Sequence, residues 1–201
     1  MLLVGLTGNY GMGKSIVLSQ FEKLGAITLD SDKIVASLLS EAEIIEKVQR
    51  LLGNKVFDEN GNLIKKKIAD LIFKNDILKS SLEDLLHPLV FEKIEVFLKT
   101  ISDQNAVIVI EVPLLFERGY EGRFKRTVTV FTDEKTTLHR LEKSGVSKDE
   151  AMQRLQSQFP IEMKTMKSDF KIDNNGTIVE TMSQVTEIYK KLSEEARIGN
   201  H

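Results

Sequence analysis

The chain has 201 residues, of which 41% are hydrophobic, and its formal net charge is −2. This length and composition fit one folded domain with insertions or two small domains, and the charge balance does not favour a nucleic-acid partner. The absence of cysteine excludes disulfides and thiolate metal sites, and three scattered histidines do not favour a zinc site.

The N-terminal segment 1–11 has no Lys or Arg and runs directly into a glycine-rich loop, which is typical of a strand and not of a signal peptide. No apolar run approaches the about 18 residues that a membrane-spanning helix needs. We therefore expect a soluble, cytoplasmic protein that does not enter a membrane. The oligomeric state stays open, with a monomer favoured.

Strands and helices alternate in the first thirty residues. The almost wholly apolar residues 2–7 predict a strand buried on both faces, and residues 26–30 predict a second strand. Between them, residues 14–24 carry apolar side chains at helical spacing, and Gly25 is well placed to end that helix. This order indicates a parallel sheet.

A mostly helical, charged block follows at residues 31–102, and it is too long for a simple crossover connection. Asn60 and Gly61 predict a turn within it, and Pro88 predicts a kink or a restart of its helix. Beyond the block the alternation resumes. Strands are predicted at 106–112, 126–131 and 169–174, and helices at 133–143, 147–159, after Pro160 and at 177–195, with Ser147 and Glu150 as a capping box.

The segment GNYGMGKS, residues 8–15, fits the pattern G-x-x-x-x-G-K-[ST]. Its glycines let successive backbone N–H groups point at phosphate oxygens, while Lys14 reaches the β and γ phosphates and the Ser15 hydroxyl can ligate Mg²⁺. The helix that follows presents its positive N-terminal end to the same anion. The strand before the pattern and the helix after it favour a nucleotide site over a glycine turn that binds nothing.

Two acids, Asp30 and Asp32, come at the C-terminal end of the second predicted strand, the edge where parallel α/β sheets collect ligands. Phosphoryl transfer to an alcohol needs a carboxylate to orient the hydroxyl and a held Mg²⁺, and two acids could divide these tasks. Alternatively, Asp32 only caps the following helix and Asp30 solvates a loop.

Five segments, GLTGNYGMGKS, LDSDKIV, LLHPLV, VPLLFE and KSDFKIDNNG, together resemble the dephospho-CoA kinase family over residues 2–185. The pairing of HP with PLLFE is the most specific part. The resemblance implies ATP-dependent phosphorylation of the ribose 3′-hydroxyl of dephospho-CoA, the last step of coenzyme A synthesis. ATP and dephospho-CoA are then the small-molecule substrates, with Mg²⁺ as cofactor.

The family implies an α/β fold of the P-loop NTPase type, with a parallel five-stranded sheet flanked by helices, in one kinase domain over residues 1–201. The implied core covers about 1–32, 103–135 and 165–201, with a helical substrate-binding insertion at about 33–102 and a lid at about 136–164.

The resemblance also implies site residues. The catalytic residues are Asp32 as presumed base, Lys14 and Arg140; the ATP-binding residues are Gly8, Gly11, Met12, Gly13, Lys14, Ser15, Ile16 and Arg154, with Ser15 also on Mg²⁺; the substrate-binding residues are Asp30, His87, Pro113, Leu114, Leu115 and Glu117. Read without the resemblance, Arg140 and Arg154 are ordinary arginines on solvated helix surfaces, and His87 is a structural helix cap. The segment from Pro113 to Phe116 then only ends a buried strand and packs in the core.

The sequence departs from the family pattern at a few positions. A usual arginine is replaced by Lys65, Phe91 and Lys143, an aspartate by Glu111, and a small residue by Ile16. Lysine lacks the bidentate phosphate grip of arginine, so the lid and CoA-side contacts are where we expect this protein to differ.

Two other functions are compatible with the loop alone. One is a kinase of the same architecture with another nucleotide-like acceptor, against which HP and PLLFE argue. The other is a GTPase-like switch or non-catalytic nucleotide-binding module; the chain has no guanine-reading N-K-x-D motif, and a module that only binds would not need Asp32.

Overall fold

The computed structural model describes residues 1–198. The chain divides into two compact units, which we describe separately. The first unit comprises Met1–Asp30 together with the chain from Asp103 onward, and the second is Ser31–Ser102.

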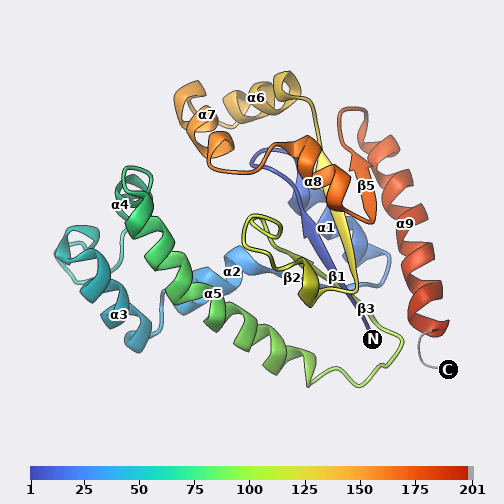
Figure 1. Cartoon of the computed structure of the whole chain (residues 1–201), viewed down its shortest axis with the longest axis horizontal. Coiled ribbons are helices and arrows are strands. Elements are labelled where there is room, and N and C mark those ends of the chain that lie inside the picture. The colour runs from blue at the N-terminus through green and yellow to red at the C-terminus, as the bar shows by residue number, and fades with distance from the viewer. Residues whose placement is uncertain (199–201) are drawn as a thin grey trace. The chain divides into compact units, whose positions relative to one another are not determined.

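The first unit is built on five parallel strands in the order β2-β3-β1-β4-β5 (Figure 1). The strands are β1 (Leu2–Thr7), β2 (Ile27–Asp30), β3 (Val107–Glu111), β4 (Arg126–Phe131) and β5 (Phe170–Asp173). Each strand predicted from the sequence is present. With helices on its two faces, the sheet confirms the predicted fold class.

One face of the sheet is covered by α1 (Lys14–Lys23) and α9 (Ile178–Ile198), which contact each other (Figure 1). Alternate strand residues point to this face, so Val4 and Leu6 of β1 join Phe21 of α1 in one buried core. On the other face, α8 (Ile161–Lys167) contacts β4.

The register of the sheet gathers polar groups at its C-terminal edge. Glu111, the last residue of β3, lies opposite Leu6 of β1 on one side and opposite Asp30 of β2 on the other. Because the glycine-rich loop leaves the same end of β1, the loop and two carboxylates meet at one edge.

Three helices lie between β4 and β5: α6 (Glu134–Lys143), α7 (Lys148–Gln156) and α8. Ser147 caps α7 by accepting from the Glu150 N–H at 3.3 Å, as the capping pattern predicts. The prediction that this helix continues to Phe159 was wrong, since α7 ends at Gln156. The Phe159 N–H donates to a side chain instead of a helical carbonyl, and the residue before a proline is disfavoured in helical conformation. A short 3₁₀ turn, η2 (Glu121–Arg123), precedes β4.

The second unit is helical. Its elements are α2 (Ser31–Leu38), α3 (Ala42–Leu52), η1 (Asn54–Val56), α4 (Lys65–Ile72) and α5 (Asp76–Leu98). They pack around a core that includes Val48, Val56, Ile68 and Leu82. The turn predicted at Asn60 and Gly61 is present, with the Asn60 N–H donating to Asp58 at 2.9 Å.

The predicted restart at Pro88 was wrong, because α5 runs through it without a break. Proline removes one backbone N–H from the helix and costs stability there. Leu82 and Leu86 before Pro88 belong to the unit's core, and Leu89 after it packs against that core. Val90 and Ile94 farther along α5 are also buried. Tertiary packing here outweighs local propensity.

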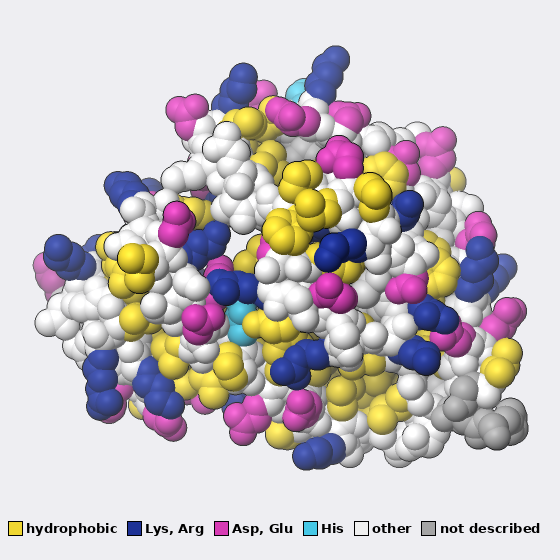
Figure 2. Space-filling view, viewed as in Figure 1, with side chains coloured by type: hydrophobic (Ala, Val, Ile, Leu, Met, Phe, Trp, Pro, Cys, Tyr) yellow, Lys and Arg dark blue, Asp and Glu magenta, His cyan; other side chains and the backbone are white. Residues whose placement is uncertain are grey.

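Among residues 1–198, no helix is both long and apolar enough to cross a membrane. On the face drawn in Figure 2, Lys and Arg side chains are interspersed with Asp and Glu side chains.

Candidate active site

The glycine-rich loop between β1 and α1 has a backbone that larger residues could not adopt. Gly13 has φ +87°, and a Cβ there would lie 2.3 Å from Nδ2 of Asn174. Gly8 has φ +148°, and a Cβ there would lie 2.3 Å from the Val130 carbonyl oxygen. The loop is therefore held in this shape by close approach to its neighbours as well as by glycine's conformational freedom.

Asn174 supports the loop from the end of β5. Its side chain is buried, donates to the Met12 carbonyl oxygen at 2.9 Å and accepts from the Thr181 hydroxyl at 2.8 Å. The loop then enters α1 at Gly13, which offers no side-chain cap to the first turn. The N–H groups of a first helical turn without a cap suit an anion.

Lys14, the first residue of α1, turns its ammonium toward the sheet edge. Its Nζ lies 3.8 Å from Oε1 of Glu111 and donates to the Asn9 carbonyl oxygen at 3.3 Å. The side chains of Lys14 and Glu111 are only 10% and 9% exposed. A buried pair at this point fixes the lysine beside the loop, where the expected role of a P-loop lysine requires it.

Oxygen donors at this edge fit Mg²⁺ better than a transition metal. They are the hydroxyl of the exposed residue Ser15 and the carboxylates of Asp30 and Glu111, two residues that lie opposite each other in the register of β2 and β3. Among the described residues no group of three or more His, Cys, Asp or Glu could hold a metal by itself. Mg²⁺ in kinases takes one or two protein oxygens together with waters and substrate phosphates, so this small donor set is compatible with it.

The last turn of α7 and the residues just after it contact the glycine-rich loop. The Tyr10 N–H donates to Oε1 of Gln158 at 2.8 Å, and Nδ2 of Asn9 donates to the Phe159 carbonyl oxygen at 3.0 Å. The Arg154 guanidinium lies 4.5 Å from the centre of the Tyr10 ring, a cation–π contact, and pairs with Glu150 at 2.7 Å. Arg154 is therefore beside the loop, as an ATP-binding role requires.

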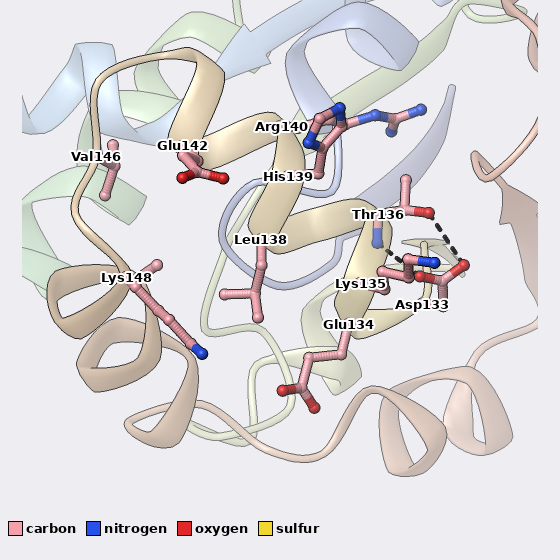
Figure 3. A pocket seen from close by; sticks show the side chains of 11 residues that line it. Asp133, Glu134, Lys135, Thr136, Leu138, His139, Arg140, Glu142, Val146 and Lys148 are labelled. Carbon is pink, nitrogen blue, oxygen red and sulfur yellow. Dashed lines mark hydrogen bonds between the residues drawn. The ribbon is translucent and has the colours of Figure 1, made fainter.

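Arg140 lies in the last turn of α6 and lines a cavity of about 980 Å³ between α6 and α7 (Figure 3). Among residues 1–198, no hydrogen bond or ion pair joins the Arg140 side chain to the loop. Its neighbour Leu141 does contact the loop, because a Cβ on Gly11 would lie 2.7 Å from the leucine side chain.

The turn after β3 contains Pro113, Leu114, Leu115 and Glu117. Leu115 is fully buried and packs beside Gly5 of β1, so it fills the core rather than a binding surface. Oε1 of Glu117 accepts from Nζ of Lys164 at 2.7 Å and from the Phe159 N–H at 3.0 Å. Lys164 also donates to the Pro113 carbonyl oxygen at 3.0 Å.

Burial lowers the pKa of Lys164, and the positive charge of Lys14 acts in the same direction, while Glu117 opposes both by its hydrogen bond and charge. The lysine side chain is fully buried. An ammonium in such a place is stable only with a close carboxylate partner, which makes Glu117 part of a buried ion pair.

The remaining predicted residues belong to the second unit. Asp32 is exposed in the first turn of α2, two residues after β2 ends. His87 lies within α5, so it does not cap a helix. Burial lowers the pKa of His87, and the Asp84 carboxylate partly offsets this, so the imidazole is predominantly neutral at neutral pH.

The structure thus brings together the glycine-rich loop, Lys14, Asp30 and Arg154 in the first unit. Three residues of this neighbourhood were not predicted as site residues from the sequence: Glu111, Lys164 and Asn174. A charge at the end of the apolar strand AVIVIE was an available signal for Glu111. The segment IEMKTMK gives no sign that one of its lysines is buried.

A model of dephospho-CoA kinases matches residues 2–180. A dephospho-CoA kinase of Aquifex aeolicus (strain VF5) is 35% identical to this chain, with 96% of this chain and 98% of the relative covered. These matches span nearly the whole chain, including both units.

Solved structures share the fold of this chain. A Thermus thermophilus protein superposes with a TM-score of 0.84 at 28% identity, covering 94% of this chain and 96% of that one. A dephospho-CoA kinase from Campylobacter jejuni superposes with a TM-score of 0.63 at 22% identity, covering 95% and 97%, and it supports the fold. The chain described here belongs to the dephospho-CoA kinase family.

Proposed function

We propose that this kinase transfers the γ-phosphoryl group of ATP to the ribose 3′-hydroxyl of dephospho-CoA, giving CoA and ADP, the last step of coenzyme A synthesis. The observation that carries the proposal is the glycine-rich loop opening α1 with Lys14 fixed beside Glu111, in a chain of this family. Phosphoryl transfer relies mostly on positioning and charge stabilisation, which such a site supplies.

The loop and Lys14 bind the donor in this account. Backbone N–H groups from Gly8 to Ser15 face the phosphates, and the Lys14 ammonium contacts the β and γ phosphates and balances charge that develops in transfer. Met12 and Ile16 contribute backbone to the same cradle. Glu111 holds Lys14 in position before ATP binds.

Ser15 and the carboxylates of Glu111 and Asp30 are the residues that would hold Mg²⁺, directly or through water. When bound with the nucleotide, the ion neutralises phosphate charge. These residues suit Mg²⁺ because they offer only oxygen ligands, with Asp30 and Glu111 at the ends of β2 and β3.

On the acceptor side, Asp32 is proposed to accept the proton of the ribose hydroxyl as the oxygen attacks the γ phosphorus. A carboxylate in this role must be ionised and solvent-accessible before substrate arrives, and Asp32 is exposed. His87 in the helical second unit is proposed to bind dephospho-CoA. The turn at Pro113 and Leu114 in the first unit is proposed as a substrate-binding segment too. His87 is uncharged at neutral pH, so it would act through hydrogen bonds or packing.

The segment at about 136–164 is proposed to act as a lid over the triphosphate, with Arg140 and Arg154 as its cations. Arg154 already lies on Tyr10 of the loop, and Arg140 is one residue from Leu141, which packs on Gly11. Cations held there would stabilise the charge that develops in transfer. The protein is further proposed to act as a cytoplasmic monomer.

The experiment that tests the function is an acceptor screen with Mg-ATP and the purified chain. Dephospho-CoA, nucleoside monophosphates and other nucleotide-like alcohols are offered separately, and ³¹P NMR identifies the phosphorylated position. The proposal predicts a new phosphate at the 3′-position of dephospho-CoA. Preferred turnover of another alcohol would replace it with a kinase of different acceptor.

A further inference from the structure

Two segments far apart in the sequence converge on Phe159, just beyond the end of α7. From the glycine-rich loop, Asn9 donates to the Phe159 carbonyl oxygen at 3.0 Å. From the turn after β3, Glu117 accepts from the Phe159 N–H at 3.0 Å. The backbone C=O of Phe159 is thereby bonded to the loop, and its backbone N–H is bonded to the turn.

Glu117 is held in turn by Lys164 of α8. The Nζ–Oε1 distance is 2.7 Å, and the two side chains are 0% and 10% exposed. Lys164 donates a second hydrogen bond to the Pro113 carbonyl oxygen at 3.0 Å, and the Thr7 hydroxyl donates to the same oxygen at 3.1 Å. The pair therefore joins the end of β1, the turn after β3 and the chain that returns from the lid.

We propose that Lys164 and Glu117 are positioning residues, which hold the Gln158–Phe159 segment against the glycine-rich loop and so set the lid cation Arg154 for nucleotide binding. The inference rests on the proposed ATP-dependent function. It assigns Glu117 an indirect part, because one carboxylate oxygen, Oε1, accepts from both Lys164 and Phe159, and the other, Oε2, is buried.

The contacts around the Lys164–Glu117 pair distinguish a positioning role from one that only stabilises the core. Gln158 accepts from the Tyr10 N–H at 2.8 Å, and Arg154 lies 4.5 Å from the Tyr10 ring, so a shift of the segment reaches the loop through two contacts. Removing one partner of the pair leaves the other charged and buried, and the local structure must rearrange. Rearrangement at Phe159 moves the groups that touch Asn9 and Tyr10.

The test compares Lys164→Met, Glu117→Gln and Lys164→Arg with the unsubstituted chain. The control is Glu195→Gln, which breaks another partly buried ion pair of the same unit, Arg126 Nε to Glu195 Oε2 at 3.0 Å, away from the loop. Three quantities are measured well below the melting temperature: amide hydrogen exchange at Phe159 and Tyr10, affinity for the fluorescent nucleotide mant-ATP, and affinity for dephospho-CoA.

Lys164→Met is expected to increase exchange at both amides and to weaken mant-ATP binding by about 10- to 100-fold, in the range produced by misplaced positioning groups. Dephospho-CoA affinity should change much less, because the Thr7 hydroxyl still donates to the Pro113 carbonyl oxygen and holds the turn after β3. Glu117→Gln keeps an acceptor for Phe159 but removes the charge, so a smaller effect in the same direction is expected, and it serves as the test if Lys164→Met does not fold. Lys164→Arg should restore part of the nucleotide affinity.

A lower melting temperature with wild-type exchange at Phe159 and wild-type mant-ATP affinity would overturn the proposal and leave a purely structural pair. Equal weakening of both ligands would overturn it too, because the effect would not be confined to the nucleotide. The exchange and nucleotide measurements need no turnover. They therefore stand even if the acceptor proves not to be dephospho-CoA.

Discussion

The Lys14 ammonium and the Glu111 carboxylate lie 3.8 Å apart, where the start of α1 meets the end of β3. Because both side chains are nearly buried, the attraction between the two charges helps to offset the cost of removing them from water. In the proposed function, triphosphate oxygens would contact the lysine, and the Glu111 carboxylate would then be one of the groups that could hold Mg²⁺.

The first prediction concerns Glu111→Gln, which keeps the side chain's shape and removes its charge. We expect kcat to fall by about 10- to 100-fold, as when a group that orients a primary ligand is lost. Steady-state kinetics with Mg-ATP measure it. Glu187→Gln, which removes an exposed pair with Lys191 on α9, is the matched control and should keep wild-type activity. Unchanged kcat in Glu111→Gln would show that the Glu111 charge is not needed to position Lys14.

The second prediction concerns the proposed base. Asp32→Asn should lower kcat by about 100-fold or more while ATP affinity stays the same, because general-base assistance is worth about 10²–10⁴ in rate. Single-turnover assays and mant-ATP titration separate the two effects. Asp70→Asn, an exposed acid on α4 of the same unit, is the control. Full activity in Asp32→Asn would remove this residue from the mechanism.

The third prediction concerns the loop's geometry. Gly13→Ala and Gly145→Ala both place a side chain at positive φ, +87° and +85°, but only at Gly13 would the new Cβ meet another atom, Nδ2 of Asn174 at 2.3 Å. We expect Gly145→Ala to lose about 1–2 kcal/mol of unfolding free energy from backbone strain.

Gly13→Ala should lose more than Gly145→Ala, because Asn174 must move and give up its hydrogen bond to the Met12 carbonyl oxygen. Nucleotide affinity should fall with it. Urea unfolding compares the two variants. Equal losses would mean that the contact with Asn174 does not constrain the loop.

The fourth prediction follows from His87. Burial lowers its pKa below the ordinary value of 6.5, so between these two values the unfolded chain binds a proton that the folded chain does not. Stability should therefore fall as the pH drops from about 6.5 through the folded-state pKa, and this contribution should level off below it.

Urea unfolding across this pH range measures the slope, and NMR titration of the imidazole gives the folded-state midpoint. The His87→Gln variant should show a smaller fall in stability over the same interval. A midpoint at or above 6.5, or an unaltered slope in the variant, would contradict the burial argument.

Much of the fold follows from the sequence because its strands are short apolar runs. The boundaries of β1 and β4 agree with the predicted 2–7 and 126–131, since both are buried in the middle of the sheet and end at polar or loop residues. Pro88 alone left a kink and a restart open. Buried residues on both sides of the proline accompany the uninterrupted α5, and this tertiary packing could not be predicted from the sequence.

The candidate site could be predicted where its residues are contiguous in the sequence and form a known motif, as in the loop from Gly8 to Ser15. It was not predictable where a contact joins distant segments. In the sequence, Lys164 looks like a surface lysine in a short polar helix. In the structure its side chain is fully buried and pairs with Glu117, which lies in a distant part of the sequence. Only the tertiary structure reveals such a pair.

The measurement that tests the central claim most directly is ³¹P NMR of the purified chain with Mg-ATP and dephospho-CoA. The account predicts loss of the ATP γ-phosphate signal, formation of ADP and a new phosphomonoester at the ribose 3′-position. No turnover of dephospho-CoA, together with phosphorylation of another nucleotide-like alcohol under the same conditions, would contradict it.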